Sequence, residues 1–369
     1  STAVAIIGAG PAGATLAALL ASRGVDVTLF DKEAFPRDKL CGEFLSYDAL
    51  PVLEGLGVVE DIDRAGAPKI DRCRVVGART YEFEFPHPAR GVSRLFLDDL
   101  LVRTAVARGA KMQVEAVNGL PRAQVIVGAW GRWGRFDQQL ARSFVNVKDR
   151  NFGFKRHYVS PANRQPPTAN RIDLYSFAKG YLGVNAIEGG LTNICGLVHA
   201  SRLAGHKGRW DAFVEHLRAE EPRLEELYAG REPAQEHFLS SEPVIFRARS
   251  AVEGGVFMIG DASGVIDPLT GNGMAMAIQS ALLAAPPILR LLAHPSQRAE
   301  IENDYRDAHH RFFAPRIAWS RRVAALLSRP RLLDAALSTV RAKGIGAALL
   351  RRTRASREEV ARLMDAWVV

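Results

Sequence analysis

The sequence predicts an α/β fold, in which a Rossmann-like domain is interleaved with an antiparallel β-sheet domain and followed by C-terminal helices. Three observations support this prediction. A strand–turn–helix–strand pattern occupies residues 3–31, short strand patterns separated by Gly, Pro and Asn fill residues 151–198, and residues 286–369 are helical and rich in Leu, Ala and Arg. The 369 residues exceed what one hydrophobic core usually serves, so we expect at least two lobes.

The first strand–helix–strand unit carries a glycine-rich turn. An apolar run, AVAII, is followed directly by GAGPAG, by a helical pattern and by a second strand that ends at Asp31. Gly8 permits the tight turn, Gly10 lets the main chain approach a pyrophosphate, and Gly13 lets the helix pack closely on the strand. Asp31 follows about 20 residues later, where a carboxylate accepts hydrogen bonds from a ribose. These residues predict a site for an adenine dinucleotide.

Residues 255–285 are the candidate for the other half of that site. Val256 to Ile259 form a short apolar run between glycines, which predicts a buried strand that delivers Asp261 onto a turn. A Gly- and Pro-rich loop, residues 264–273, then leads into a long helix. The first amides of a helix have no partner inside the helix and favour negative charge, so this helix start can face the ligand.

The middle of the chain predicts the sheet domain. Alternating residues between 70 and 85 indicate a hairpin, a helix follows within residues 91–110, and residues 111–127 form short strands. The predicted division is a discontinuous dinucleotide-binding domain (residues 1–69, 92–135 and 245–290), a substrate-binding β-sheet domain (70–91 and 136–244) and a C-terminal helical region (291–369).

Composition limits the partners. The formal charge is +9, but much of the excess lies in Arg-rich helical sequence, and no helix-turn-helix or zinc-finger pattern is visible, so we expect no nucleic acid. The basic residues from Arg311 to Arg357 predict a solvated helix face rather than a membrane surface, and His309 and His310 are expected at the surface. The expected partner is a small-molecule substrate; a separate reductase or carrier protein stays open.

The cysteines and the apolar runs indicate the compartment. Cys41, Cys73 and Cys195 are an odd, widely spaced set, which favours neither a disulfide framework nor a zinc site, and no metal site is predicted. No signal peptide pattern precedes the first strand, and no apolar run is expected to be long enough to span a bilayer. We therefore expect a cytoplasmic location.

Five motifs, in order, resemble a known family: GAGPAG, Asp31, PRDKLCGE, SRLFLDDLL and GDASGVIDPLTGNGMAMA. They are similar to those of the FAD-dependent aromatic-hydroxylase superfamily of flavoprotein monooxygenases. The branch that holds geranylgeranyl reductases and flavin-dependent halogenases is the most similar, over most of residues 3–285. The resemblance implies FAD as the cofactor.

Carried over by position, the resemblance assigns parts of FAD to residues. The N-terminal glycines would hold the pyrophosphate, Asp31 the adenosine ribose, Arg94 would contact the cofactor, and Asp261 would bind the ribityl or pyrophosphate part. The loop from Pro268 to Gly273 would pass along the isoalloxazine ring. The implied cofactor-binding residues are Gly8, Gly10, Pro11, Ala12, Gly13, Asp31, Lys32, Arg37, Cys41, Arg94, Gly260, Asp261, Pro268, Gly271, Asn272, Gly273 and Met274.

Candidate catalytic residues fall into two groups. The first shapes the reacting face of the ring and consists of Pro268, Gly271, Asn272 and Gly273. In the second group, Cys41 either touches the reaction or is a small buried residue. Glu43 either acts as an acid or base, or caps the next helix or pairs with Arg37 or Lys39.

His157 completes the second group as a proton shuttle by its pKa class, with a surface strand as the alternative. It lies on one predicted strand with Lys155, Arg156 and Tyr158. Alternate residues of a strand share a face. Either Lys155 and His157, or Arg156 and Tyr158, would therefore face the cavity between the domains.

Three departures from the family narrow the reaction. Residues 129–132 read AWGR where the family often has Asp-Gly, which leaves NAD(P)H, reduced flavin or another reductant open. The halogenase signature is absent, because Trp133 stands in GRWGRF and no lysine follows GAGPAG; Trp130 and Trp133 are expected to pack at the domain junction. The aromatic strand of prenyl reductases keeps Tyr181 but has Gly183 in place of Trp.

The sequence therefore predicts a FAD-dependent oxidoreductase. The first hypothesis is a monooxygenase that uses O2 to hydroxylate or epoxidise a small secondary metabolite. The alternative is a flavin-dependent reductase or dehydrogenase of an unsaturated substrate. A third hypothesis is a non-catalytic binding protein that kept the fold, which the intact glycines, Asp31 and Asp261 argue against.

Overall fold

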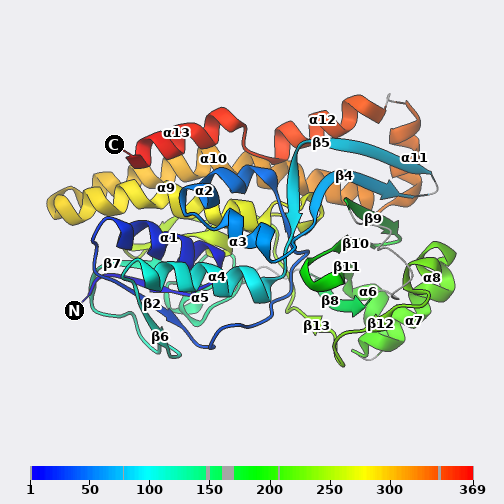
Figure 1. Ribbon diagram of the computed structural model, residues 1–369, viewed down its shortest axis with the longest axis horizontal. Coiled ribbons are helices and arrows are strands. Elements are labelled where there is room, and N and C mark those ends of the chain that lie inside the picture. The colour runs from blue at the N-terminus through cyan, green and yellow to red at the C-terminus, as the bar shows by residue number, and fades with distance from the viewer. Residues whose placement is uncertain are drawn as a thin grey trace.

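The computed structural model describes residues 2–77, 79–146, 150–159, 170–206, 208–339 and 342–368. Two β-sheets lie side by side, and the C-terminal helices extend across both of them (Figure 1). The predicted α/β class, with a Rossmann-like domain interleaved with a second, mainly antiparallel sheet, is confirmed.

The six-stranded sheet follows from the N-terminal strand–helix–strand pattern. Its strands are parallel except at one edge, where β14 runs antiparallel to β15. Its spatial order is β14 (Val252–Glu253), β15 (Val256–Met258), β7 (Ala123–Gly128), β1 (Thr2–Ile7), β2 (Val27–Asp31) and β6 (Lys111–Val114). The inner strands are buried, as expected of a parallel sheet covered by helices.

The nine-stranded sheet holds the predicted hairpin and the strands of residues 151–199. It is antiparallel except that β4 and β9 are parallel. Its order is β12 (Glu232–Pro233), β8 (Asn151–Val159), β11 (Leu191–His199), β10 (Gly180–Ala186), β9 (Arg171–Phe177), β4 (Lys69–Val76), β5 (Thr80–Gly91) and β3 (Phe44–Leu45), with β13 (Leu239–Ser240) also pairing with β8. The short strand β3 belongs to this sheet although it lies inside residues 1–69; the predicted domain boundaries stay a prediction.

Helices cover the six-stranded sheet and the outer face of β8 and β11. The helices are α1 (Pro11–Ser22), α2 (Leu50–Gly55), α3 (Val59–Arg64), α4 (Arg94–Ala107), α5 (Arg135–Gln139), α6 (Ala200–Leu203), α7 (Trp210–Glu220), α8 (Pro222–Tyr228), α9 (Gly273–Ala293), α10 (Arg298–Leu327), α11 (Pro330–Thr339), α12 (Ala342–Thr353) and α13 (Arg357–Val368). The α1, α4 and α9 helices share one apolar core with the sheet. Figure 1 shows α9, α10 and α13 packed along each other above that sheet.

The helix α9 corrects one expectation. Its 21 residues are long and apolar enough to cross a membrane by length and composition, although no such run was expected. Of its most apolar window, 67% is buried inside the protein, against α1, α10 and α13. A helix buried in this way is the core helix of the fold, and its N-terminus is positioned by that packing.

Candidate FAD and substrate site

A cavity of about 810 Å³ lies where the carboxyl ends of β1, β2 and β7 meet one face of β9, β10 and β11. Ligands of α/β sheets bind at the carboxyl ends of the strands, and this volume falls in the range of small-molecule sites. One end of the cavity is formed by the glycine turn and Asp31, and the other by apolar side chains of the nine-stranded sheet. The cavity therefore joins a cofactor region to a substrate region.

The glycine turn requires glycine at two positions. A Cβ atom on Gly8, whose φ is +107°, would lie 2.2 Å from the carbonyl oxygen of Ala129, and one on Gly13 would lie 1.9 Å from that of Gly8. Gly13 packs behind the turn, whereas Gly8, Gly10, Pro11 and Ala12 line the cavity. No side chain caps the first amides of α1 and no acidic residue lies in its first turn, so these amides fit a pyrophosphate.

Asp31 is held as an anion at the end of β2. Its carboxylate accepts hydrogen bonds from the Ala9 amide (2.9 Å) and from Arg37 (3.0 Å). Burial would raise its pKa, but Arg37 and the backbone amides outweigh burial and lower it. Arg37 also pairs with Asp98 (3.1 Å), which binds Arg94 through two hydrogen bonds of 2.6 and 2.7 Å. The four predicted contacts of this region, Asp31, Lys32, Arg37 and Arg94, all line the same cavity.

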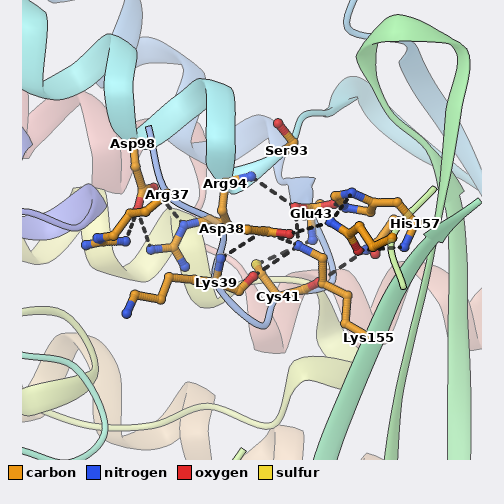
Figure 2. A network of polar contacts seen from close by, with 12 residues as sticks. Arg37, Asp38, Lys39, Cys41, Glu43, Ser93, Arg94, Asp98, Lys155 and His157 are labelled. Carbon is orange, nitrogen blue, oxygen red and sulfur yellow. Dashed lines mark hydrogen bonds and ion pairs between the residues drawn. The ribbon is translucent and has the colours of Figure 1, made fainter. Parts of the chain in front are cut away.

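Glu43 is the centre of a buried polar network (Figure 2). Its Oε1 accepts hydrogen bonds from Lys155 Nζ (2.6 Å) and from the Arg94 amide at the start of α4 (3.0 Å), and its Oε2 lies 2.6 Å from His157 Nε2. Glu43 thus accepts from the first amide of α4, whereas the prediction was a cap on the next helix along the chain, which is α2; that prediction is wrong. Its ion pair is with Lys155, and the expected pairing with Arg37 or Lys39 is wrong.

The alternation along β8 decides which residues face the site. Lys155 and His157 point toward Glu43, while Arg156 pairs with Asp211 of α7 and Tyr158 packs on the opposite face. His157 is 1% exposed, so the surface alternative is wrong, yet it lies behind the cavity wall and does not line the cavity. A direct proton transfer from His157 to substrate therefore has no geometric support.

Lys155 is a fully buried cation. Its Nζ donates to Asp38 (2.5 Å) and to the carbonyl of Lys39 (3.1 Å) as well as to Glu43. Burial opposes its charged form, but Glu43 and Asp38 outweigh burial and raise the pKa of Lys155. The network therefore joins the segment from Asp38 to Glu43, at the cavity wall, to the nine-stranded sheet.

The substrate end of the cavity is mainly apolar. Its lining residues from this end are Phe44, Ile172, Leu174, Tyr181, Gly183, Asn185, Cys195, Leu197, Val244, Phe246 and Val265. Tyr181 donates to Asp267 (2.7 Å), which leaves its ring facing the cavity. A Cβ atom on Gly183 would meet Leu174 at 3.7 Å and Cys195 O at 3.8 Å, which is ordinary contact, so Gly183 leaves open room there.

Cys41 and Cys195 lie on facing walls of the cavity as free thiols. The Cys41 carbonyl accepts a hydrogen bond from Asn193 (3.1 Å), two residues from Cys195 on the same strand face. Burial raises the pKa of Cys41, and it raises the pKa of Cys195 to about 12. Both thiols are therefore protonated near neutral pH, and neither is an activated nucleophile.

The loop from Pro268 to Gly273 closes the cavity next to the start of α9. Pro268, Gly271 and Gly273 line the cavity together with Gly260, Asp261 and Met274. The side chain of Asn272 does not: its Nδ2 donates to the carbonyl oxygen of Thr353 (2.5 Å), and the place of its main chain beside the ring stays a prediction. The side chains of Leu269, Thr270 and Asn272 are buried in the protein, so Pro268 and the glycines are what this loop presents to the cavity.

Three further expectations need correction or detail. His309 is buried beside Ser263 (2.9 Å) and burial lowers its pKa to about 3, so it is a neutral core residue. Arg316 and Arg354, expected on a solvated face, are 6% and 7% exposed and form ion pairs or hydrogen bonds inside the protein. Trp130 packs on Phe136, as predicted, and also lines the cavity.

Comparison with known proteins gives the cofactor independently. Residues 1–118 match the family model of the FAD binding domain. The menaquinone reductase of Mycolicibacterium smegmatis is 29% identical over an alignment of 371 positions, which covers 90% of this chain and 86% of that protein.

Two solved structures share the fold. The flavin-dependent brominase Bmp2 covers 99% of this chain and 98% of its own, with a TM-score of 0.79 at 20% identity. The geranylgeranyl bacteriochlorophyll reductase-like protein of Thermoplasma acidophilum covers 99% of both chains, with a TM-score of 0.74 at 18% identity. At these identities the structural similarity establishes the fold alone.

The glycine turn, the uncapped start of α1 and the anionic Asp31 fit FAD, and with the family match they define a FAD-binding flavoprotein. The chain is a FAD-dependent oxidoreductase; its predicted resemblance is borne out by the FAD binding domain, and the solved halogenase and geranylgeranyl reductase-like structures share its fold.

Proposed function

We propose that this enzyme is a FAD-dependent monooxygenase that hydroxylates or epoxidises a small, apolar, cyclic or conjugated metabolite. The observation that carries the proposal is the apolar compartment at the substrate end of the 810 Å³ cavity, continuous with the cofactor region. Bound FAD supplies the electrons for O2 reduction, so that one oxygen atom enters the substrate and the other leaves as water. Gly183 provides the room for a ring.

The residues of the chain bind, orient and exclude water. Asp31 and the first amides of α1 hold the adenosine and pyrophosphate parts, and the loop from Pro268 to Gly273 orients the ring. Phe44, Leu174 and the other apolar side chains keep water from the reacting atoms, which protects reactive intermediates from hydrolysis. This division requires no metal ligand and no activated side-chain nucleophile.

The ionisable groups at the apolar end favour oxygenation over reduction. Reduction of a carbon–carbon double bond by hydride transfer needs an acid that protonates the neighbouring carbon. Burial raises the pKa of the candidates Cys41, Cys195 and Tyr181, and Glu43, which also lines the cavity, accepts hydrogen bonds from Lys155 and the Arg94 amide. Such weak acids suit a reaction in which the protein donates no proton to the substrate.

Reduction of an unsaturated substrate is the second candidate, because the menaquinone reductase of M. smegmatis is similar to this chain over nearly its whole length. In this alternative, the apolar compartment would hold an isoprenoid or quinone part of the substrate, and Cys41 or Cys195 would be the proton donor. A small-molecule substrate, a separate reductase as electron source and a cytoplasmic location stay proposals under either candidate.

Isotope labelling separates the two candidates. The FAD-loaded enzyme is reduced photochemically without oxygen and then mixed with a naphthol under heavy-isotope oxygen gas, and the product is analysed by mass spectrometry. A hydroxylated product that carries the label supports monooxygenation. In a parallel anaerobic arm with menaquinone, a product that gains two hydrogens, with no labelled product in the first arm, contradicts the first proposal and supports reduction.

A further inference from the structure

The turn between α12 and α13, residues 353–355, is buried against the loop assigned to the isoalloxazine ring. Arg354 Nη2 donates to the carbonyl oxygen of Thr270 (2.8 Å), and the carbonyl oxygen of Thr353 accepts from Asn272 Nδ2 (2.5 Å). Two consecutive residues of the turn therefore hold the loop on both sides of Gly271, which has a φ of +62°. The C-terminal region, which carries no recognisable motif, thus reaches the cofactor loop from behind.

Arg354 also fixes the neighbouring wall of the cavity. Its Nε donates to Ser46 Oγ (2.9 Å), just after β3, and its guanidinium carbon lies 5.9 Å from the ring centroid of Phe44. The Phe44 ring lies against Gly271, where a Cβ atom would come within 2.7 Å of it. One side chain therefore positions the loop and the aromatic wall relative to each other.

The turn itself is anchored to the long helices. Asp48 Oδ2 accepts hydrogen bonds from the Ala355 amide (3.1 Å), from Arg316 of α10 (3.2 Å) and from Gln279 of α9 (3.0 Å). All four residues belong to the protein interior. Because α9 begins at the loop, this arrangement ties the loop, the turn and both helices into one rigid unit.

Two buried arginines lie behind the loop, and the buried carboxylate of Asp267 at the start of the loop accepts a hydrogen bond from Tyr181. Arg316 and Arg354 both face the carboxylate of Asp48, and Glu359 acts on Arg316 from the far side. The uncharged phenol of Tyr47 and the thiol of Cys73 are the other titratable groups next to Arg354. Burial lowers the pKa of both arginines, but a guanidinium stays protonated in proteins. Among the residues that the structure describes, Arg354 forms no ion pair, so Asp48, which pairs with Arg316, offsets its positive charge only at longer range.

We propose that Arg354 is a positioning residue of the flavin site, which fixes the loop from Pro268 to Gly273 and favours the reduced, anionic flavin through its charge. Positive charge near a developing anion stabilises that anion, more strongly inside a protein than in water. The inference depends on FAD as the cofactor and holds for an oxygenase and for a reductase alike. It is therefore independent of the proposed function.

Three variants of the full-length FAD-loaded enzyme test the proposal. Arg354→Met removes the charge and the hydrogen bonds, and Arg354→Lys keeps the charge but cannot make both bonds. Arg352→Met removes an exposed arginine at the end of α12, whose guanidinium carbon lies 4.2 Å from the Trp319 ring centroid. The midpoint potential, the visible spectrum and the FAD dissociation constant are measured, together with the melting temperature of the FAD-free protein.

Arg354→Met is expected to lower the affinity for reduced FAD, relative to oxidised FAD, about tenfold. For a two-electron couple this corresponds to a midpoint potential roughly 30 mV more negative. Arg354→Lys should keep the parent potential but change the visible spectrum and weaken FAD binding, because the loop is no longer held. Arg352→Met should match the parent in every measurement.

Two results would overturn the proposal. The first is an Arg354→Met enzyme with the potential and spectrum of the parent, even if its FAD-free form melts at a lower temperature, since Arg354 would then serve folding alone. If Arg354→Met does not fold, Arg354→Lys decides: a parent spectrum together with a parent FAD dissociation constant shows that the two hydrogen bonds do not position the loop.

Discussion

Replacement of Lys155 by Met should destabilise the protein more than any other single change in the polar network. Lys155 is fully buried and pairs with Asp38 at 2.5 Å and Glu43 at 2.6 Å, and the Glu43 side chain is itself inaccessible to solvent. Removal of one partner from a buried ion pair typically costs about 3–5 kcal/mol, because the other charge stays buried without compensation. Here two carboxylates lose their cation, so we expect the upper part of that range.

The assay is urea unfolding of the parent and of the variant, with Lys111→Met as the control. Lys111 pairs with Asp26 at 2.7 Å on the surface, and 65% of its side chain is exposed. Its replacement should therefore leave the free energy of unfolding unchanged within experimental error. A Lys155→Met protein whose free energy of unfolding lies within roughly 1 kcal/mol of the parent value would refute the reasoning, since the network would then contribute no net stability.

The difference in free energy of unfolding between the parent and Lys155→Met depends on pH through two pKa shifts. Burial would raise the pKa of Asp38, but Lys155 outweighs burial and lowers it, so the stabilisation is present above about pH 4 and is lost as the pH falls through the lowered pKa. The pKa of Lys155 is raised, so its contribution is present below about pH 10 and is lost as the pH rises through the raised value. The difference between parent and variant should therefore be constant from about pH 5 to 9.

Three further predictions concern the cavity. Asp261→Ala should weaken FAD binding about 10–100-fold, as expected for lost hydrogen bonds to a charged group, before it alters product selectivity; equilibrium dialysis that finds unchanged retention would count against its placement. Gly183→Leu should fill the substrate end and raise KM for bulky substrates about tenfold with unchanged FAD affinity, whereas an unchanged KM would place the substrate elsewhere. Gly13→Ala should abolish FAD binding or folding, because its Cβ atom would lie 1.9 Å from the Gly8 carbonyl oxygen. Gly205→Ala, outside the cavity lining and with no neighbour within 4 Å, should be tolerated, and equal behaviour of the two variants in thermal melts would contradict the close packing at Gly13.

Most of the fold could be predicted from patterns of residues that lie close in sequence. Two units were predictable because each pattern uses residues close in sequence: the strand–turn–helix–strand unit that ends at Asp31, and the strand before Asp261. Their glycines stand where the backbone conformation or a close approach excludes any other residue. The parallel pairing of β4 with β9 was not predictable, because 94 or more residues separate their ends and no local pattern records which distant strands meet. The short strand β3 is likewise formed only by its pairing with β5.

The site divides in the same way. Residues that line the cavity through backbone turns were found from the sequence, whereas side-chain contacts between distant segments were missed or misassigned. Asn272 was expected beside the ring because it lies in the glycine loop, but its partner is Thr353, 81 residues later. Glu43 was expected to pair with a neighbouring cation, but its cation is 112 residues away. Arg354 belongs to no recognisable motif. In a helical tail, the sequence alone does not distinguish a buried arginine from a solvent-exposed one.

Hydrogen bonds and ion pairs, and not apolar contacts alone, join the two sheets around Glu43. The proposed function requires this, because the distance between the two sheets sets the distance between cofactor and substrate. Asp31 and the glycine turn belong to the six-stranded sheet, while Gly183 and Cys195 belong to the other one. Apolar contacts alone would tolerate a small sliding of one sheet past the other, whereas a misplacement of about 1 Å can cost a hundredfold in rate. Glu43 keeps a left-handed φ of 54°, a conformation that costs a non-glycine residue about 1–3 kcal/mol and persists only where surrounding contacts determine it. Its bonds to Lys155, His157 and the start of α4 supply that determination, so the strain at Glu43 marks the point where the two sheets are brought into register.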